Sequence, residues 1–117
     1  MTTMKEFQSQ TNKRAIHEMA KGIEQAIKDC KTGRYYPWAN AIIDGEFSLS
    51  DRNEVAKKYI EEGGWYAVFH KTSSENGERP GLTSFGLFTP ESYAKWDKAC
   101  GEDYKSKGHI FFNKEII

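Results

Sequence analysis

The chain has 117 residues, enough for one domain, and its 38% hydrophobic and 29% charged residues are typical of a polar globular protein. The 17 cationic and 17 anionic side chains cancel, so general attraction to a polyanion is excluded and nucleic-acid binding would need a local patch. No run approaches the roughly 18 apolar residues of a membrane span, and residues 1–10 lack the apolar region of a signal peptide. We therefore expect a cytoplasmic protein with no membrane partner.

The N-terminal half of the sequence predicts helices. Residues 1–10 are polar and predict a flexible arm, followed by a single domain over 11–117. Apolar residues recur with the i, i+3/i+4 spacing of one buried helical stripe, which predicts a helix over 12–32. The stripe consists of Ile16, Met19, Ala20, Ile23, Ile27 and Cys30.

Two further helices are expected before the first strand. Pro37 favours the first position of a short helix that reaches Ile43, because proline is tolerated where the helical amide has no partner. Asp51 with Glu54 three residues later resembles a capping box, which predicts a helix over 51–62.

The C-terminal half predicts three strands and one helix. Aromatic and β-branched residues dominate 65–71, 82–88 and 109–116, and such residues favour strands. Between the last two strands, Thr89 as the N-cap and proline at the next position predict a helix over 90–107.

These elements predict an α+β fold in the order α-α-α-β-β-α-β. A layer of three helices would pack on a small, mostly antiparallel three-stranded sheet. The expected core residues are Ile16, Ile23, Ile27, Val55, Tyr59, Val68, Phe85, Trp96, Ile110 and Phe112. Because a three-stranded sheet has two exposed edges close together, we also expect a two-fold homodimer.

The sequence offers no recognisable catalytic, metal or cofactor motif. His17, His70 and His109 have no metal-ligand spacing, and no nucleophile elbow or phosphate-binding glycine loop occurs. His70 is expected as a half-exposed strand residue, while Cys30 and Cys100 are expected as buried, reduced thiols. We therefore expect no cofactor, no bound metal and no enzymatic activity.

One short segment combines cations with aromatic rings. It joins the first two predicted helices and contains Lys31, Arg34, Tyr35, Tyr36 and Trp38, which we call the basic-aromatic cluster. Tyr, Trp and Arg are enriched in protein interfaces, and single-strand nucleic-acid binders also combine cations with stacking rings. The aromatic members could equally be core residues beneath a helix corner. We predict that this cluster binds a macromolecular partner.

Residues 38–88 resemble helix–helix–hairpin modules of small accessory proteins of tailed bacteriophages. The resemblance rests on the segments 41–48, 55–64 and 65–68. It implies a small, cytoplasmic, non-enzymatic protein of a class in which some members inhibit host or defence machinery by binding it.

Together these observations predict an interaction protein that binds and inhibits or bridges a protein partner. A small nucleic-acid-binding protein that uses the basic-aromatic cluster is the first alternative. A protein that binds a small ligand between helices and sheet is the second.

Overall fold

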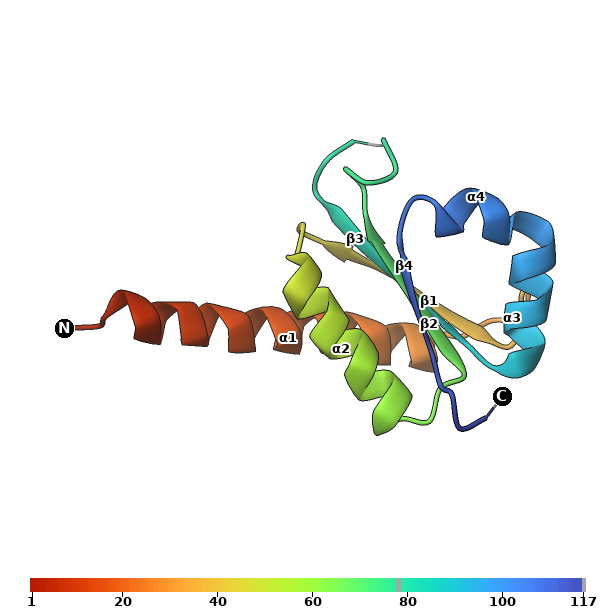
Figure 1. Ribbon diagram of the computed structural model, residues 1–117, viewed down its shortest axis with the longest axis horizontal. Coiled ribbons are helices and arrows are strands. Elements are labelled where there is room, and N and C mark those ends of the chain that lie inside the picture. Colours follow the sequence, from red (N-terminus) through yellow and green to blue (C-terminus); the bar gives the residue numbers. More distant parts are fainter. Residues whose placement is uncertain (78, 117) are drawn as a thin grey trace.

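The computed structural model describes residues 1–77 and 79–116 and has an α+β fold, as predicted. The elements in chain order are α1 (Met4–Lys28), β1 (Trp38–Asp44), α2 (Leu49–Glu61), β2 (Ala67–Thr72), β3 (Leu82–Phe88), α3 (Pro90–Trp96), a π-helical turn (Asp97–Gly101), α4 (Glu102–Lys105) and β4 (His109–Phe112). The four strands form one antiparallel sheet in the order β1-β3-β2-β4. Figure 1 shows these elements.

The predicted short helix after Pro37 is wrong, because this segment is the edge strand β1. Its side chains alternate between the two faces of the sheet, and Ala39, Ala41 and Ile43 are buried on one of them. Alternation with a period of two fits a strand and not a helix. The sheet therefore has four strands instead of the three that we expected.

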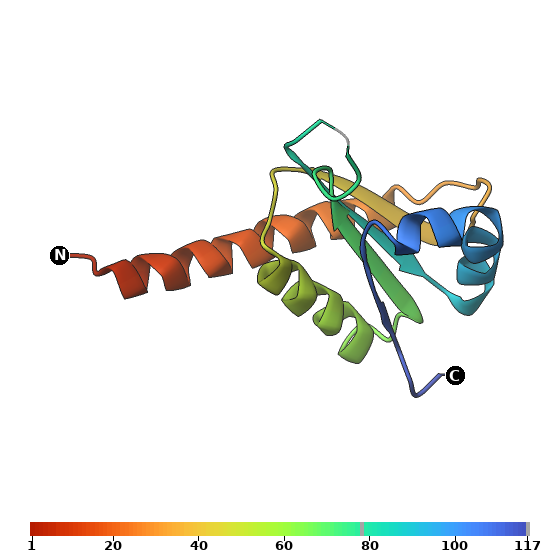
Figure 2. The same ribbon diagram turned by 45° about the horizontal axis from the view of Figure 1, so that its top comes forward.

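The single layer of three helices is also wrong, because helices cover both faces of the sheet (Figure 2). α2 connects β1 to β2 past β3, and the segment 90–105 connects β3 to β4 past β2. Each connection joins two parallel strands, and both shift in the same direction across the sheet, but the pair β1 and β2 runs opposite to the pair β3 and β4. Connections of the same hand must then lie on opposite faces, in keeping with the strong preference for one hand.

The larger core lies between the sheet and the helices α1 and α2. Its centre includes Ile23, Val55, Val68 and Phe85, all of which are 0–1% exposed. α1 approaches β1 closely at Gly22, where a Cβ atom would lie only 2.7 Å from Cγ1 of Ile43. The predicted core is confirmed, since each of its ten members is buried or half-buried.

A smaller aromatic core lies on the other face, under the segment 90–105. Trp96 packs there on Phe69 and Phe88, with ring centroids 5.3 and 4.9 Å apart. This segment lies on the route from β3 to β4 and covers the sheet near β2 and β4. Much of β1 and the first half of β3 remain uncovered on this face, as the exposure of Ile42 and Leu82 shows. We call this uncovered area the open half-face.

Side-chain caps also fix the starts of α2 and α3. The predicted cap at Thr89 is confirmed, and its partner Ser92 completes a reciprocal capping box. At α2 the cap is Ser48 and not Asp51, because the Ser48 hydroxyl accepts a hydrogen bond from the Asp51 amide. α2 consequently begins at Leu49, two residues earlier than predicted.

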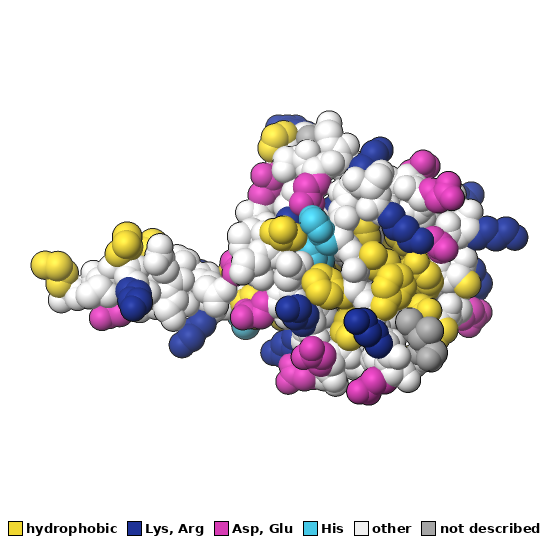
Figure 3. All heavy atoms as spheres, in the orientation of Figure 1, with side chains coloured by type: hydrophobic (Ala, Val, Ile, Leu, Met, Phe, Trp, Pro, Cys, Tyr) yellow, Lys and Arg dark blue, Asp and Glu magenta, His cyan; other side chains and the backbone are white. Residues whose placement is uncertain are grey.

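The first helix is longer than predicted and projects from the body (Figure 1). It begins at Met4, capped by the Thr3 hydroxyl, so most of the expected arm is helical. All residues of 1–14 are exposed, and an amide–carboxylate hydrogen bond from Asn12 to Asp51 ties this half to α2. Figure 3 shows hydrophobic side chains on the projecting part of this helix, where Met4 is 75% and Phe7 is 59% exposed.

Candidate functional site

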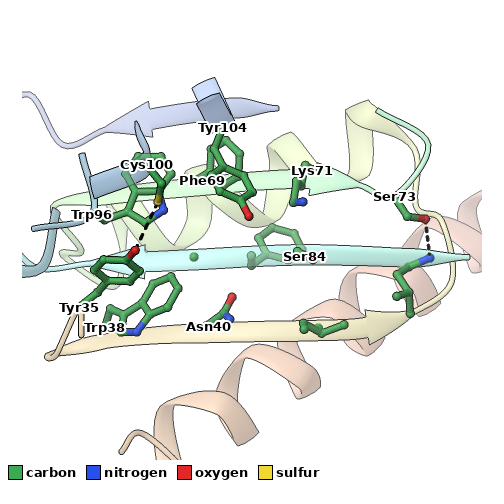
Figure 4. Close-up of a pocket in the computed structure, with 14 residues that line it drawn as sticks. Tyr35, Trp38, Asn40, Phe69, Lys71, Ser73, Ser84, Trp96, Cys100 and Tyr104 are labelled. Atoms are coloured by element: carbon green, nitrogen blue, oxygen red, sulfur yellow. Dashed lines mark hydrogen bonds between the residues drawn. The ribbon is translucent and has the colours of Figure 1, made fainter. Parts of the chain in front are cut away.

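The open half-face is hollowed into a groove of about 390 Å³ (Figure 4). β1 and β3 supply its floor through Asn40, Ile42, Ser84 and Gly86. Gly86 has no side chain to fill the floor, and a Cβ atom there would lie only 3.1 Å from the Phe88 ring. Aromatic residues line both sides. They are Tyr35 and Trp38 at the β1 side and Phe69, Trp96 and Tyr104 at the β2 side.

The groove exposes apolar side chains that the fold leaves uncovered. Ile42 is 67% exposed and Leu82 is 36% exposed. Their side chains are on the same face, two residues apart in register, since Ile42 pairs with Ser84 and Asp44 pairs with Leu82. Exposed apolar area with a polar rim is typical of interaction sites.

The structure divides the basic-aromatic cluster into residues of the groove and residues of the surrounding surface. Tyr35 and Trp38 line the groove, while Lys31, Arg34 and Tyr36 are exposed outside it. Lys31 instead lines a second groove, between α1 and β1. The cluster is thus neither a single patch nor entirely core.

Contacts with neighbouring side chains hold Trp38 and Tyr35 in place. Trp38 stacks on Phe88 at 5.5 Å, and Tyr35 meets the Trp38 ring edge-on at 5.3 Å. The Tyr35 hydroxyl lies 3.6 Å from the thiol of Cys100 across the groove. Two half-buried rings held in this way resemble preformed binding anchors, which lose little conformational entropy on contact.

The second groove, of about 430 Å³, follows the outer edge of β1. We call it the edge groove. α1 supplies one wall through Gly22, Gln25 and Ala26, and β1 supplies the other between Trp38 and Ile42. Cys30 lies at one end, where its thiol donates a hydrogen bond of 3.1 Å to the Trp38 carbonyl. Cys30 is therefore exposed, contrary to our prediction, while Cys100 is half-buried; both are free thiols.

A polar cluster that the sequence did not reveal links α2 to the sheet. Arg52 is buried on α2 and donates to Nδ1 of His70 at 3.1 Å and to both oxygens of Glu75 at 3.0–3.1 Å. His109 contacts the same carboxylate at 3.2 Å. The members of this cluster are far apart in the sequence, so no local sequence motif predicts it. Glu75, which follows β2, is thereby linked to α2 through Arg52 and to β4 through His109.

His70 is fully buried, so the prediction of a half-exposed strand residue is wrong. A guanidinium only donates hydrogen bonds, so Nδ1 accepts from Arg52 and Nε2 carries the proton that bonds Asn53 at 2.9 Å. Burial, and then the charge of Arg52, lower the pKa of His70 to about 3. His70 is consequently a neutral structural residue at physiological pH.

Glu75 is ionised for the complementary reason. Burial alone would raise its pKa, but hydrogen bonds from Arg52 and from the Thr72 amide, together with the charge of Arg52, lower it to about 2. The cluster therefore contains a fixed ion pair beside a neutral imidazole. No lining residue of the two grooves belongs to it, which argues for a role in stability.

Within residues 1–77 and 79–116, no three histidine, cysteine or acidic side chains are grouped as metal ligands. In the same part of the chain, no helix has the length and hydropathy needed to cross a bilayer. No model of a known protein family, no curated protein and no solved structure matches the chain. Any function must therefore be argued from the grooves themselves.

Proposed function

We propose that the chain is a non-enzymatic binding protein that holds a protein partner on the open half-face. The observation that carries this proposal is the uncovered apolar floor, where Ile42 is 67% exposed in a groove that Tyr35, Trp38 and other aromatic residues also line. Interface centres combine such apolar area with Tyr and Trp anchors and a polar rim. Asn40 and Ser84 supply polar groups within this groove.

The charge around the groove supports a protein partner over nucleic acid. Lys31 and Arg34 lie beyond one end of β1 and Lys71 lines the groove, but Asp44 is exposed at the other end of β1. A phosphate backbone would meet repulsion at the Asp44 end, and the chain has no net positive charge to compensate. A protein partner with mixed charge meets no such penalty. Inhibition or bridging of that partner, as the bacteriophage resemblance implies, is the expected consequence of binding.

Variants on the groove test the proposal. Tyr35→Ala and Ile42→Ser remove an aromatic anchor and an exposed floor residue, and Leu49→Ser is the control because Leu49 is 42% exposed on α2, away from the groove. Proteins captured from a lysate of the source organism are quantified for each variant, and the affinity of any partner lost with the groove variants is then measured. Loss of an anchor costs about 2–4 kcal/mol, or roughly 30- to 1,000-fold in affinity.

The melting temperature of each variant is measured in parallel. If the groove variants fold normally and bind as well as Leu49→Ser, the proposal is wrong. If nucleic acid is captured instead, and its affinity falls by about 10³-fold between 50 and 200 mM salt, phosphate contacts dominate and the nucleic-acid alternative replaces the proposal.

A further inference from the structure

We infer that the partner contributes an extended segment that pairs as a fifth strand with the outer edge of β1. This inference rests on the proposed function and specifies how the partner is recognised. It requires an edge with outward-facing backbone groups, room on both sides of the added strand, and a reason why a lone strand fits better than another domain. The structure supplies all three.

The backbone of β1 presents hydrogen-bonding groups to the outside. The Gly45 amide bonds the Gly81 carbonyl at 2.7 Å, so the odd-numbered residues of this ladder bond to β3. The even-numbered residues therefore turn their amides and carbonyls outward, and the Trp38 carbonyl, which accepts from the Cys30 thiol, confirms this parity. At Asn40 and Ile42 no other described segment pairs with the outer edge.

The sequence of β1 lacks the residues that normally prevent an edge strand from pairing. It has seven residues, without lysine, arginine or proline, whereas the opposite edge strand β4 has four. Natural edges are usually protected by such residues, by short length or by a covering helix or loop. α1 forms one wall of the edge groove, but among the described residues no segment bonds the outward backbone groups of Asn40 and Ile42, so this edge is suited to strand addition, a common mode of peptide recognition.

Side chains of an added strand would enter both grooves. The strand would lie about 4.8 Å beyond β1, and its side chains would point alternately to the two faces of the sheet. One row would enter the open half-face beside Ile42, and the other would enter the edge groove beside Gly22 and Ala26 of α1. The edge groove, of about 430 Å³, is the space available to that second row.

The position of α1 selects a lone segment over a second copy of the chain. α1 lies against β1 at Gly22 and, with the residues that follow it up to Lys31, forms one wall of the edge groove, so it occupies the strip under the vacant strand position. A two-fold copy joined through β1 would bring its own α1 into that strip. A single extended segment carries no helix and avoids this conflict.

The charges near the two ends of β1 predict where the added segment carries a charged residue. Lys31 and Arg34 are exposed near the Trp38 end of the edge and outnumber the nearby Asp29 carboxylate, which accepts a hydrogen bond from the Gln25 amide. The opposite end carries exposed Asp44. The complementary segment alternates apolar side chains and has an acidic residue beside the Trp38 end.

The test uses peptides selected from a displayed library of random twelve-residue sequences against the full chain. The strongest peptide is then synthesised in two forms, each N-methylated at alternate residues, one form at odd and the other at even positions. An added strand turns only one set of amides toward β1. We expect one form to lose at least about 100-fold in affinity and the other to bind nearly as well as the parent peptide.

The variant Asn40→Pro removes an outward amide without touching the ladder to β3, and it should weaken the same peptide. Equal effects of the two methylated forms, or no selected peptide, would overturn the inference. In either case, if Tyr35→Ala still weakens binding of a peptide or of a partner from the lysate, the proposed function stands without strand addition. A stable dimer of the chain that Asn40→Pro dissociates would show that a second copy occupies the edge, and would also overturn the inference.

Discussion

Lowering the pH from 7.5 to 5 should destabilise the fold mainly through His70. The ring is buried and neutral, and its pKa falls from 6.5 to about 3 on folding. The unfolded chain therefore binds a proton at this residue below pH 6.5 that the folded chain does not bind until about pH 3. The contribution of the neutral His70 to the free energy of unfolding is fully present above pH 6.5 and decreases as the pH falls from 6.5 toward 3.

The magnitude follows from the two pKa values. A pH of 5 lies about 1.5 units below the pKa of the unfolded histidine. At about 1.4 kcal/mol per unit, the free energy of unfolding therefore falls by about 2 kcal/mol. Glu75 also has a lowered pKa, of about 2, but its contribution is lost mainly below pH 4.5. The interval from pH 7.5 to 5 thus isolates His70 from that carboxylate.

Urea unfolding at several pH values measures the effect. The variant His70→Gln should be less stable at pH 7.5 but should show little further loss by pH 5, because glutamine does not titrate. His17→Gln is the matched control, since His17 is exposed on α1 and its replacement should leave the wild-type slope. A wild-type loss below about 0.5 kcal/mol, or an unchanged slope in His70→Gln, would refute the reasoning.

Three further predictions concern stability and ionisation. Arg52→Met leaves a partly buried carboxylate without its cation and should lower the free energy of unfolding by about 2–3 kcal/mol in urea titrations; a loss under about 0.5 kcal/mol would contradict the importance of the ion pair. Gly108→Ala should lower the free energy of unfolding by about 1–3 kcal/mol, because a Cβ atom there would lie 2.8 Å from a β2 carbonyl oxygen. Gly33→Ala is the control and should be nearly neutral, because a Cβ atom there would have nothing within 4 Å. Similar losses in both variants would contradict this packing. Burial and the carboxylate of Glu24 raise the pKa of Tyr59 to about 12, so ultraviolet titration should show one tyrosine ionising late, a signal that Tyr59→Phe removes.

Local signals in the sequence predicted some elements well. β3 has the predicted bounds, and the cap at Thr89 is correct, because strand composition and helix capping depend on neighbours within a few residues. The segment after Pro37 misled us because alanines favour helices and proline favours a helix start. Its period-two burial depends on α1 approaching at Gly22, which is a tertiary property.

The candidate site was only partly predictable for the same reason. Tyr35 and Trp38 could be chosen from residue type and spacing, and both line the groove. Ile42 and Leu82 could not be chosen, because their exposure depends on which half of the sheet the segment 90–105 covers. The environment of His70 likewise depends on a cation 18 positions earlier in the chain.

Because the first half of α1 projects from the body, the two halves of this continuous helix should differ in local stability. At about 1.5 Å per residue its 25 residues extend for about 37 Å, and the first half has almost no packing to hold it. Short helices without tertiary contacts are only marginally stable in water. Amide hydrogens before Asn12 should therefore exchange through local fraying, while those around Ile23 should require global unfolding. The protection of α1 should accordingly rise along its length, and binding at the tip would register as slower exchange there without any change in the core.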